Sequence, residues 1–119
     1  MSLTIYHNPR CSKSRKTLKI LKDAGVAPDI VDYQSEPPSA RRIVELASRL
    51  GVAVKDLLRT HEPDFRNAND LPDLDDDNAL AAWLNRNPKV LERPIVVNDT
   101  SGKAVIGRPP ESVSRLLHQ

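Results

Sequence analysis

The only cysteine of this 119-residue chain, Cys11, stands in a short polar stretch whose residue types could do chemistry. The stretch covers residues 6–15 and reads YHNPRCSKSR, so that Arg10, Lys13 and Arg15 flank the thiol. A helical pattern begins directly after Cys11, which predicts that the thiol lies at a helix N-terminus. Unpaired backbone N–H groups and the helix dipole favour negative charge there and lower the pKa of a cysteine. The stretch therefore predicts a reactive thiolate in a loop that can also bind an oxyanion.

A single cysteine cannot form a disulfide within its own chain. Ser14 occupies the position of the second cysteine in a Cys-x-x-Cys motif. Its hydroxyl can donate a hydrogen bond to a thiolate, but it cannot resolve a mixed disulfide. If Cys11 does redox work, the resolving thiol must come from another molecule. The alternative is that Cys11 fills a small apolar space, and its basic and polar neighbours argue against that reading.

The elements that must position Cys11 follow a strand–helix–strand order. Residues 3–6 are apolar and are followed at once by the turn signal Asn8-Pro9, which indicates a central strand. Apolar residues then recur at helical spacing from Ser12 as far as Gly25, a typical residue after a helix end. Residues 29–33 form a second apolar run. The pattern predicts a βαβ unit with two parallel strands and a right-handed crossover.

Residues from about 39 to 90 are predicted to form a helical segment. Ser39 is a good N-cap for its first helix, and Asp76 or Asp77 fits the N-cap of its last helix. The stretch between these helices, over residues 60–77, is polar and looks least ordered. Its acidic residues lack the spacing and the glycine of a calcium loop, so we expect helix caps there and no metal site.

The last third of the chain predicts two antiparallel strands and a helix. Residues 93–97 form the third strand, with Pro94 at its first position. A turn at residues 99–102 leads to the fourth strand at 103–107, and a last helix opens at 108–111. Together with the parallel pair, this hairpin predicts an α/β fold with a four-stranded mixed sheet. The element order is β-α-β, a helical insertion, and β-β-α.

This order, with a cysteine at the first strand-to-helix junction and a proline at the start of the third strand, resembles the thioredoxin/glutaredoxin fold. The closer resemblance is to the glutaredoxin-linked arsenate reductase (ArsC) family, and it runs from residue 3 to about residue 117. The matching blocks are YHNPRC at 6–11, SR at 14–15, LLR at 57–59, ERPIVV at 92–97 and GRP at 107–109. The resemblance implies a single thioredoxin-like domain over residues 1–119, with a helical insertion at about 39–90.

The resemblance also implies a reaction. Cys11 attacks arsenate and forms a covalent thiol–arsenate adduct, glutathione then attacks, glutaredoxin takes the mixed disulfide, and arsenite leaves. No bound cofactor is implied, because glutathione is a co-substrate. The family's oxyanion ligands match three arginines of this chain, namely Arg59, Arg93 and Arg108. Pro94 matches the fold's cis-proline, which packs beside the thiol and leaves a backbone edge for the glutathione peptide.

His7 matches a family histidine that is associated with tuning the thiolate. From its residue type alone, a hydrogen bond from His7 to the neighbouring turn is an equally good interpretation. Lys13 stands where smaller neutral residues are common in the family. Its charge either lowers the thiol pKa further or interferes with the anion.

The arginines are also suitable oxyanion ligands on chemical grounds, independently of the family resemblance. Guanidinium groups bind oxyanions through a fixed fork of N–H donors, which an ammonium group lacks. Several arginines and a helix N-terminus would also offset the repulsion between a thiolate and an anionic substrate.

Composition excludes several other partners and locations. The net charge is only +2 and aromatic residues make up 3% of the chain, which argues against nucleic-acid binding. No apolar run reaches the length of a membrane-spanning helix. The first residues enter a strand pattern without the form of a signal peptide, so we expect a cytoplasmic protein.

Two other functions fit the same fold. One is a general glutathione-dependent thiol–disulfide reductase without arsenate activity. The other is a non-enzymatic regulator that binds RNA polymerase, as in a related branch that senses redox state through Cys-x-x-Cys. Ser14 removes that redox switch, so the regulator ranks below both enzymes.

Overall fold

The structure is a computed structural model that describes residues 2–118. The chain separates into two compact units. The sheet unit comprises the residues up to Tyr33 and those from Arg93 onward, and the helical unit comprises Gln34–Glu92. Among the described residues, no helix is long and apolar enough to cross a membrane.

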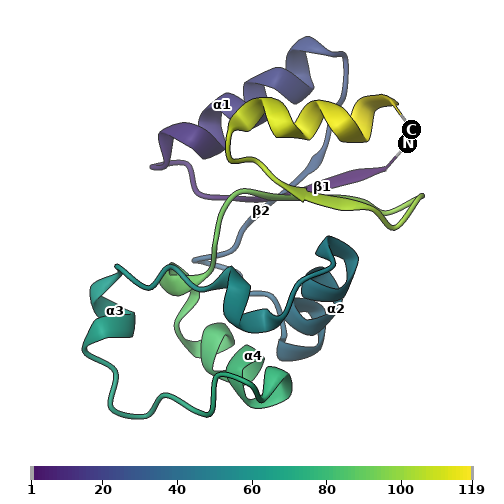
Figure 1. Ribbon diagram of the computed structural model, residues 1–119. Coiled ribbons are helices and arrows are strands. Elements are labelled where there is room, and N and C mark those ends of the chain that lie inside the picture. The colour runs from purple at the N-terminus through teal and green to yellow at the C-terminus, as the bar shows by residue number, and fades with distance from the viewer. Residues whose placement is uncertain (1, 119) are drawn as a thin grey trace. The chain divides into compact units, whose positions relative to one another are not determined.

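The sheet unit contains the predicted four-stranded mixed sheet (Figure 1). Its strands are β1 (Leu3–His7), β2 (Asp29–Asp32), β3 (Ile95–Asn98) and β4 (Ala104–Ile106), in the order β2-β1-β3-β4. β1 pairs in parallel with β2 and antiparallel with β3, and β3 pairs antiparallel with β4. The predictions of a central first strand, a βαβ unit and a C-terminal hairpin are confirmed.

Two helices lie side by side on one face of this sheet, α1 (Ser12–Asp23) and η3 (Pro110–His118) (Figure 1). α1 buries residues spaced three and four apart, namely Ser14, Thr17 and Leu21. Gly25 follows its end with a φ of 79°, a conformation that glycine adopts without steric cost. η3 is a 3₁₀ helix, a geometry that the sequence pattern did not predict.

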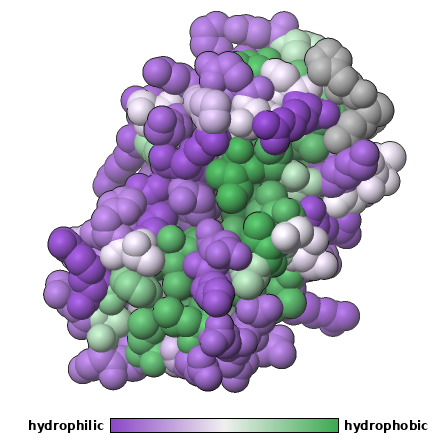
Figure 2. Space-filling model, in the orientation of Figure 1, coloured by the Kyte–Doolittle hydropathy of each residue, from purple (hydrophilic) through white to green (hydrophobic). Residues whose placement is uncertain are grey.

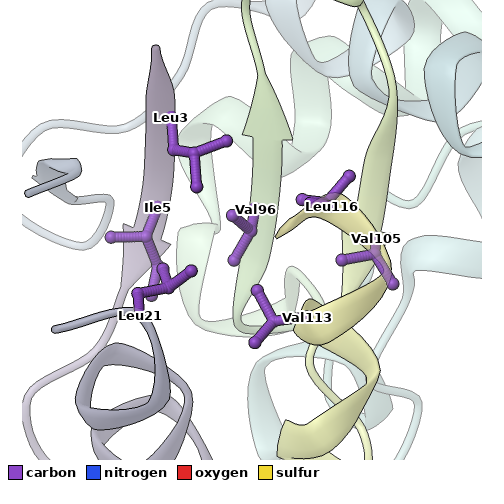
Figure 3. Packing of buried hydrophobic residues seen from close by; sticks show 7 residues of the cluster. All are labelled: Leu3, Ile5, Leu21, Val96, Val105, Val113 and Leu116. Atoms are coloured by element: carbon purple, nitrogen blue, oxygen red, sulfur yellow. The ribbon is translucent and has the colours of Figure 1, made fainter. Parts of the chain in front are cut away.

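A hydrophobic core joins these two helices to the sheet (Figure 3). Alternate residues of β1 point toward the helices, as the two-residue period of a strand requires. The cluster comprises Leu3, Ile5, Leu21, Val96, Val105, Val113 and Leu116. By contrast, hydrophilic residues cover much of the surface seen in Figure 2. Because it binds α1 to β1 and β3, this core fixes the start of α1, where the cysteine lies.

The helical unit contains α2 (Ala40–Leu50), η1 (Val54–Leu57), α3 (Pro63–Arg66), α4 (Asp77–Arg86) and η2 (Pro88–Val90). Buried side chains of α2 and α4 form its interior, namely Ile43, Leu46, Leu80, Trp83 and Leu84. The prediction of a single domain with an insertion at about 39–90 stays a prediction.

Side-chain caps begin both long helices of the helical unit. The Ser39 side chain accepts from the N–H of Arg42 at 3.1 Å, and the Asp76 side chain accepts from the N–H of Ala79 at 3.1 Å. Both predicted caps are confirmed, with Asp76 taking the second position. The polar stretch at 60–77 contains α3, a single helical turn that the sequence pattern did not predict.

Candidate active site

Cys11 is the N-cap residue of α1 and lies in the tight connection between β1 and that helix. Its backbone N–H donates to the carbonyl of Asn8 at 3.0 Å, and its own carbonyl accepts from the N–H of Arg15 at 3.0 Å. The backbone is therefore fixed on both sides of the thiol. Cys11 is a free, half-buried cysteine.

Four groups donate toward the sulfur of Cys11 or place positive charge beside it. The Nη2 of Arg108 donates to Sγ at 3.7 Å. Burial by itself raises the pKa of the Cys11 thiol. The backbone N–H of Ser14, the side chain of Arg93, the backbone N–H of Lys13 and the charge of Arg108 act in the opposite direction and outweigh burial. The pKa of Cys11 is therefore below its ordinary value, which favours the thiolate.

Arg108 is oriented by the segment that contains Arg93 and Pro94. Its Nε donates to the carbonyl of Arg93 at 2.7 Å. The N–H of Gly107 donates to the carbonyl of Pro94 at 2.9 Å. The Arg93–Pro94 peptide bond is cis, as the resemblance implied, and the Arg108–Pro109 bond is cis as well. These contacts join the start of β3 to the end of β4 and direct Arg108 toward the thiol.

Gly107 is required by the close approach of α1 to these two segments. A Cβ atom at this position would lie 2.5 Å from Thr17 Oγ1 and 2.8 Å from Pro94 Cγ. Both distances are shorter than side chains tolerate. Neither Gly107 nor Thr17 was predicted to be a site residue, although Gly107 opens the matched GRP block.

Arg93 lies beside the buried side chain of Tyr33, at the end of β2. Burial alone lowers the pKa of Arg93. The charge and hydrogen bonding of Tyr33 and Cys11 outweigh that effect, and the pKa of Arg93 lies above its ordinary value. Arg93 therefore stays charged beside the thiol. Tyr33 is a second supporting residue that the sequence analysis did not identify.

The hydroxyl of Ser14 contacts His7 and Asn8. Its Oγ lies 2.6 Å from His7 Nδ1 and accepts from the N–H of Asn8 at 3.1 Å. This hydroxyl can donate to a thiolate, but here it contacts His7 and Asn8, and the backbone N–H of Ser14 acts on Cys11. The reason is that the end of β1 places His7 and Asn8 directly against Ser14, the buried residue in the first turn of α1.

Burial is the main cause that lowers the pKa of His7 below its ordinary value. The charge of Asp32 opposes this change, and the charges of Arg15 and Lys22 add to it. A neutral imidazole accepts at one ring nitrogen. In the tautomer that carries its proton on Nε2, His7 accepts the hydroxyl proton of Ser14 at Nδ1, while Ser14 Oγ accepts from the N–H of Asn8. His7 thus contacts the turn through Ser14.

Arg59, the third predicted oxyanion ligand, lies in the helical unit. Its Nη1 donates to Glu92 at 3.1 Å and its Nε to Glu62 at 3.4 Å. Its Nη2 lies 3.2 Å from His61 Nε2. Its backbone N–H donates to the carbonyl of Val90 at 2.7 Å. The Arg59 guanidinium is thus held by two carboxylates of its own unit.

Comparison with known proteins extends the resemblance over nearly the whole chain. Residues 6–116 match the ArsC family. An arsenate reductase of Haemophilus influenzae is 40% identical, over 98% of this chain and 100% of that protein. The uncharacterized protein YfgD of Escherichia coli K12 is 44% identical over 114 residues, which are 95% of this chain and 94% of YfgD.

The solved structure of an arsenate reductase from Vibrio cholerae superposes with a TM-score of 0.84 at 40% identity and covers 97% of both chains. The mixed sheet, the helix that starts at Cys11 and the cis-proline before β3 are thus parts of a thioredoxin-like fold. With this fold and a family match that includes the thiol loop, Arg93 and Arg108, the chain belongs to the ArsC family.

Proposed function

We propose that this protein reduces arsenate to arsenite and that Cys11 is the nucleophile. The proposal is based on the positively charged and N–H groups that surround Sγ of Cys11. Arg108 donates to Sγ at 3.7 Å, and Arg93 and two backbone N–H groups at the start of α1 also lower the thiol pKa. The arsenate reductases among the relatives support arsenate as the oxyanion.

In the first step, the Cys11 thiolate attacks arsenic. A sulfur–arsenic bond forms, and one arsenate oxygen takes up protons and leaves as water. Both reactants are anionic, so positive charge at the sulfur is needed to offset their repulsion. The guanidinium groups of Arg93 and Arg108 supply this charge and present paired N–H donors to the arsenate oxygens.

In the second step, the thiolate of glutathione attacks the sulfur of Cys11. The electron pair of the sulfur–arsenic bond stays on arsenic, which is reduced from As(V) to As(III) and leaves as arsenite. Cys11 is left in a mixed disulfide with glutathione. The thiolate of glutaredoxin then attacks the glutathione sulfur and releases the Cys11 thiolate. A partner thiol is required because Cys11 is the only cysteine of the chain.

Other residues have supporting roles in this proposal. Pro94 offers a backbone edge to glutathione, and its cis peptide bond fits that role. His7 and Ser14 hold the turn that carries the thiol. Arg59 stays a predicted oxyanion ligand, and to bind arsenate it would exchange part of its contact with Glu62 and Glu92. A cytoplasmic location belongs to the proposal, since glutathione keeps thiols reduced in that compartment.

The proposal is tested by an assay that couples arsenate reduction to NADPH oxidation. Purified protein is mixed with glutathione, glutaredoxin, glutathione reductase and NADPH, and arsenate is then added. We expect NADPH consumption to start on addition of arsenate and to be absent in Cys11→Ser, which lacks the nucleophile. Phosphate, which has the same shape and charge, serves as a competitor.

The same assay discriminates the second candidate, a general thiol–disulfide reductase. The observation that favours it is the half-buried, activated thiol of Cys11, which small disulfides could also reach. If NADPH consumption does not respond to arsenate but starts with a small disulfide, the arsenate assignment fails and the thiol–disulfide reductase replaces it.

A further inference from the structure

The positive charge of the chain is concentrated on the loop and helix that carry the thiol. Residues 1–22 hold six of the 18 Lys and Arg residues and none of the 16 acidic residues. That leaves 12 basic residues against all 16 acidic ones, so the rest of the chain is net negative. The six are Arg10, Lys13, Arg15, Lys16, Lys19 and Lys22.

Four of these six side chains, Arg10, Lys13, Lys16 and Lys22, are exposed and form no ion pair or hydrogen bond with residues 2–118. Lys22 lies in the last turn of α1, at the end of the helix away from Cys11. By contrast, Arg15 donates to a backbone carbonyl at 2.9 Å and Lys19 pairs with an aspartate at 2.7 Å. We refer to Arg10, Lys13 and Lys16 as the basic patch.

The basic patch adjoins the sulfur but faces solvent. Arg10 directly precedes Cys11, and Lys13 and Lys16 lie one helical turn apart on α1. The part-buried Arg93 and Arg108 already supply charge at Sγ. Arg93 and Arg108 can therefore bind a small oxyanion at the sulfur. The basic patch is left for a larger anionic partner.

We propose that the basic patch docks the protein that reduces Cys11, and that carboxylates surround the reactive thiol of this reductant. The inference rests on the proposed function, in which an outside thiol must reach a mixed disulfide on Cys11. The partner's thiolate attacks the glutathione sulfur, and the disulfide bond to Cys11 breaks. Cys11 leaves as a thiolate, and the partner carries the glutathione in a new mixed disulfide.

Exposed charges such as those of the basic patch change mainly the rate at which two proteins associate. Exposed ion pairs contribute little to affinity because water and salt screen them. A patch of one sign nevertheless raises association rates with an oppositely charged protein by about 10-fold to 1000-fold at low salt. The basic patch should therefore control the second-order rate constant of reduction, and added salt should abolish its effect.

The experiment uses protein that carries glutathione on Cys11. Because the chain has one cysteine, treatment with glutathione disulfide gives a single mixed disulfide. A glutaredoxin of strongly acidic isoelectric point is the reductant, and release of glutathione is followed at low and high salt. For Arg10→Glu/Lys16→Glu we expect about a tenfold lower rate constant at low salt and a rate near wild type at high salt. Glutamate near a helix N-terminus is compatible with the helix dipole, so α1 should remain folded.

A matched variant, Lys103→Glu/Arg115→Glu, changes the net charge equally. Both side chains are exposed and lie in the β3–β4 turn and in η3. We expect it to react with glutaredoxin nearly as the wild type does. Dithiothreitol, which is uncharged, should reduce all three proteins at the same rate, since it needs no docking surface.

Several results would overturn the proposal. Equal slowing in the two double variants would mean that net charge alone matters. Equal slowing with dithiothreitol would mean that the chemistry at Cys11 has changed. An equal effect on reduction by free glutathione would assign the basic patch to small anionic thiols. Unchanged glutaredoxin rates, together with oligonucleotide binding lost only in Arg10→Glu/Lys16→Glu, would assign it to a nucleic acid.

Arsenate takes no part in this experiment, so the docking proposal and the proposed function can fail separately. A charge effect without arsenate-dependent NADPH oxidation would leave docking intact and reject the arsenate assignment. Arsenate-dependent oxidation without a charge effect would reject docking and leave the enzyme assignment intact.

Discussion

The reactivity of Cys11 depends on a competition between burial and hydrogen bonding. Burial raises the pKa of the thiol, and the donors at Sγ, among them Ser14 N–H and Arg93, lower it by more. The folded protein therefore stabilises the thiolate form of Cys11 relative to the thiol form. This contribution to stability is fully present above the pKa of the unfolded chain, and it is lost as the pH falls through the lower pKa of the folded protein.

Arg93→Gln should raise the thiol pKa, because it removes a charged donor to Sγ. The rate of alkylation by iodoacetamide is measured against pH. We expect a wild-type midpoint below the free-thiol value of about 8.5 and a higher midpoint for the variant. Arg10→Gln is the control and should leave the midpoint unchanged, since Arg10 is not among the groups that shift this pKa. A wild-type midpoint at or above the free value would refute the activated thiolate.

At the scale of residues, the sequence predicted the thiol and its helix N-terminus because both follow from local order. Arg93 and Arg108 were selected through the family resemblance, and the structure brings both to the sulfur. The contacts of the Ser14 hydroxyl with His7 and Asn8 were not predicted. They depend on how the end of β1 packs against α1, which local sequence does not determine.

At the scale of elements, the contact between α1 and the end of β4 holds the site. Gly107→Ala would place a methyl group 2.5 Å from Thr17 Oγ1, so the segment that carries Arg108 must move. We expect a stability loss of about 1–3 kcal/mol in denaturant unfolding. Loss of the Arg108 contact should also raise the thiol pKa, which iodoacetamide alkylation measures.

Thr17→Ala provides the matched control for this substitution. Thr17 contributes two of the three close neighbours of the added methyl group. The double variant Gly107→Ala/Thr17→Ala should therefore recover part of the lost stability and lower the thiol pKa again. The contact between Gly107 and Thr17 does not position Arg108 if Gly107→Ala changes neither the stability nor the thiol pKa. The same conclusion follows if the double variant has the stability and the thiol pKa of the single variant.

Helices and strands with strong local signals were predicted well. α1, α2 and α4 have apolar spacing and capping residues that specify them locally. The 3₁₀ geometry of η3 and the one-turn α3 were not predicted, because short or tightly wound helices leave a weak periodic signal. The role of Gly107 was also missed, since its neighbours Thr17 and Pro94 are remote in sequence.

At the scale of the whole molecule, the order of elements and the matched blocks predicted the thioredoxin-like fold. The insertion was expected at about 39–90, and the compact helical unit spans Gln34–Glu92. Its limits lie in the turn after β2 and in the connection before β3, where contacts determine the boundary and local patterns do not. The excess of positive charge in residues 1–22 is countable in the sequence, but its availability to a partner required the exposure of each side chain.

In the proposed reaction, Cys11 attacks arsenate but needs a second thiol to complete the cycle. A single-turnover reaction tests both parts of this mechanism. Wild-type protein is incubated with arsenate and one equivalent of glutathione in the absence of glutaredoxin, so that no free glutathione remains to reduce the mixed disulfide, and arsenite and the protein mass are measured. We predict about one arsenite released per chain and one glutathione bound to Cys11, because a one-cysteine chain cannot resolve the mixed disulfide. An unmodified Cys11 with no arsenite released, or continued arsenite release without a mixed disulfide, would contradict this mechanism.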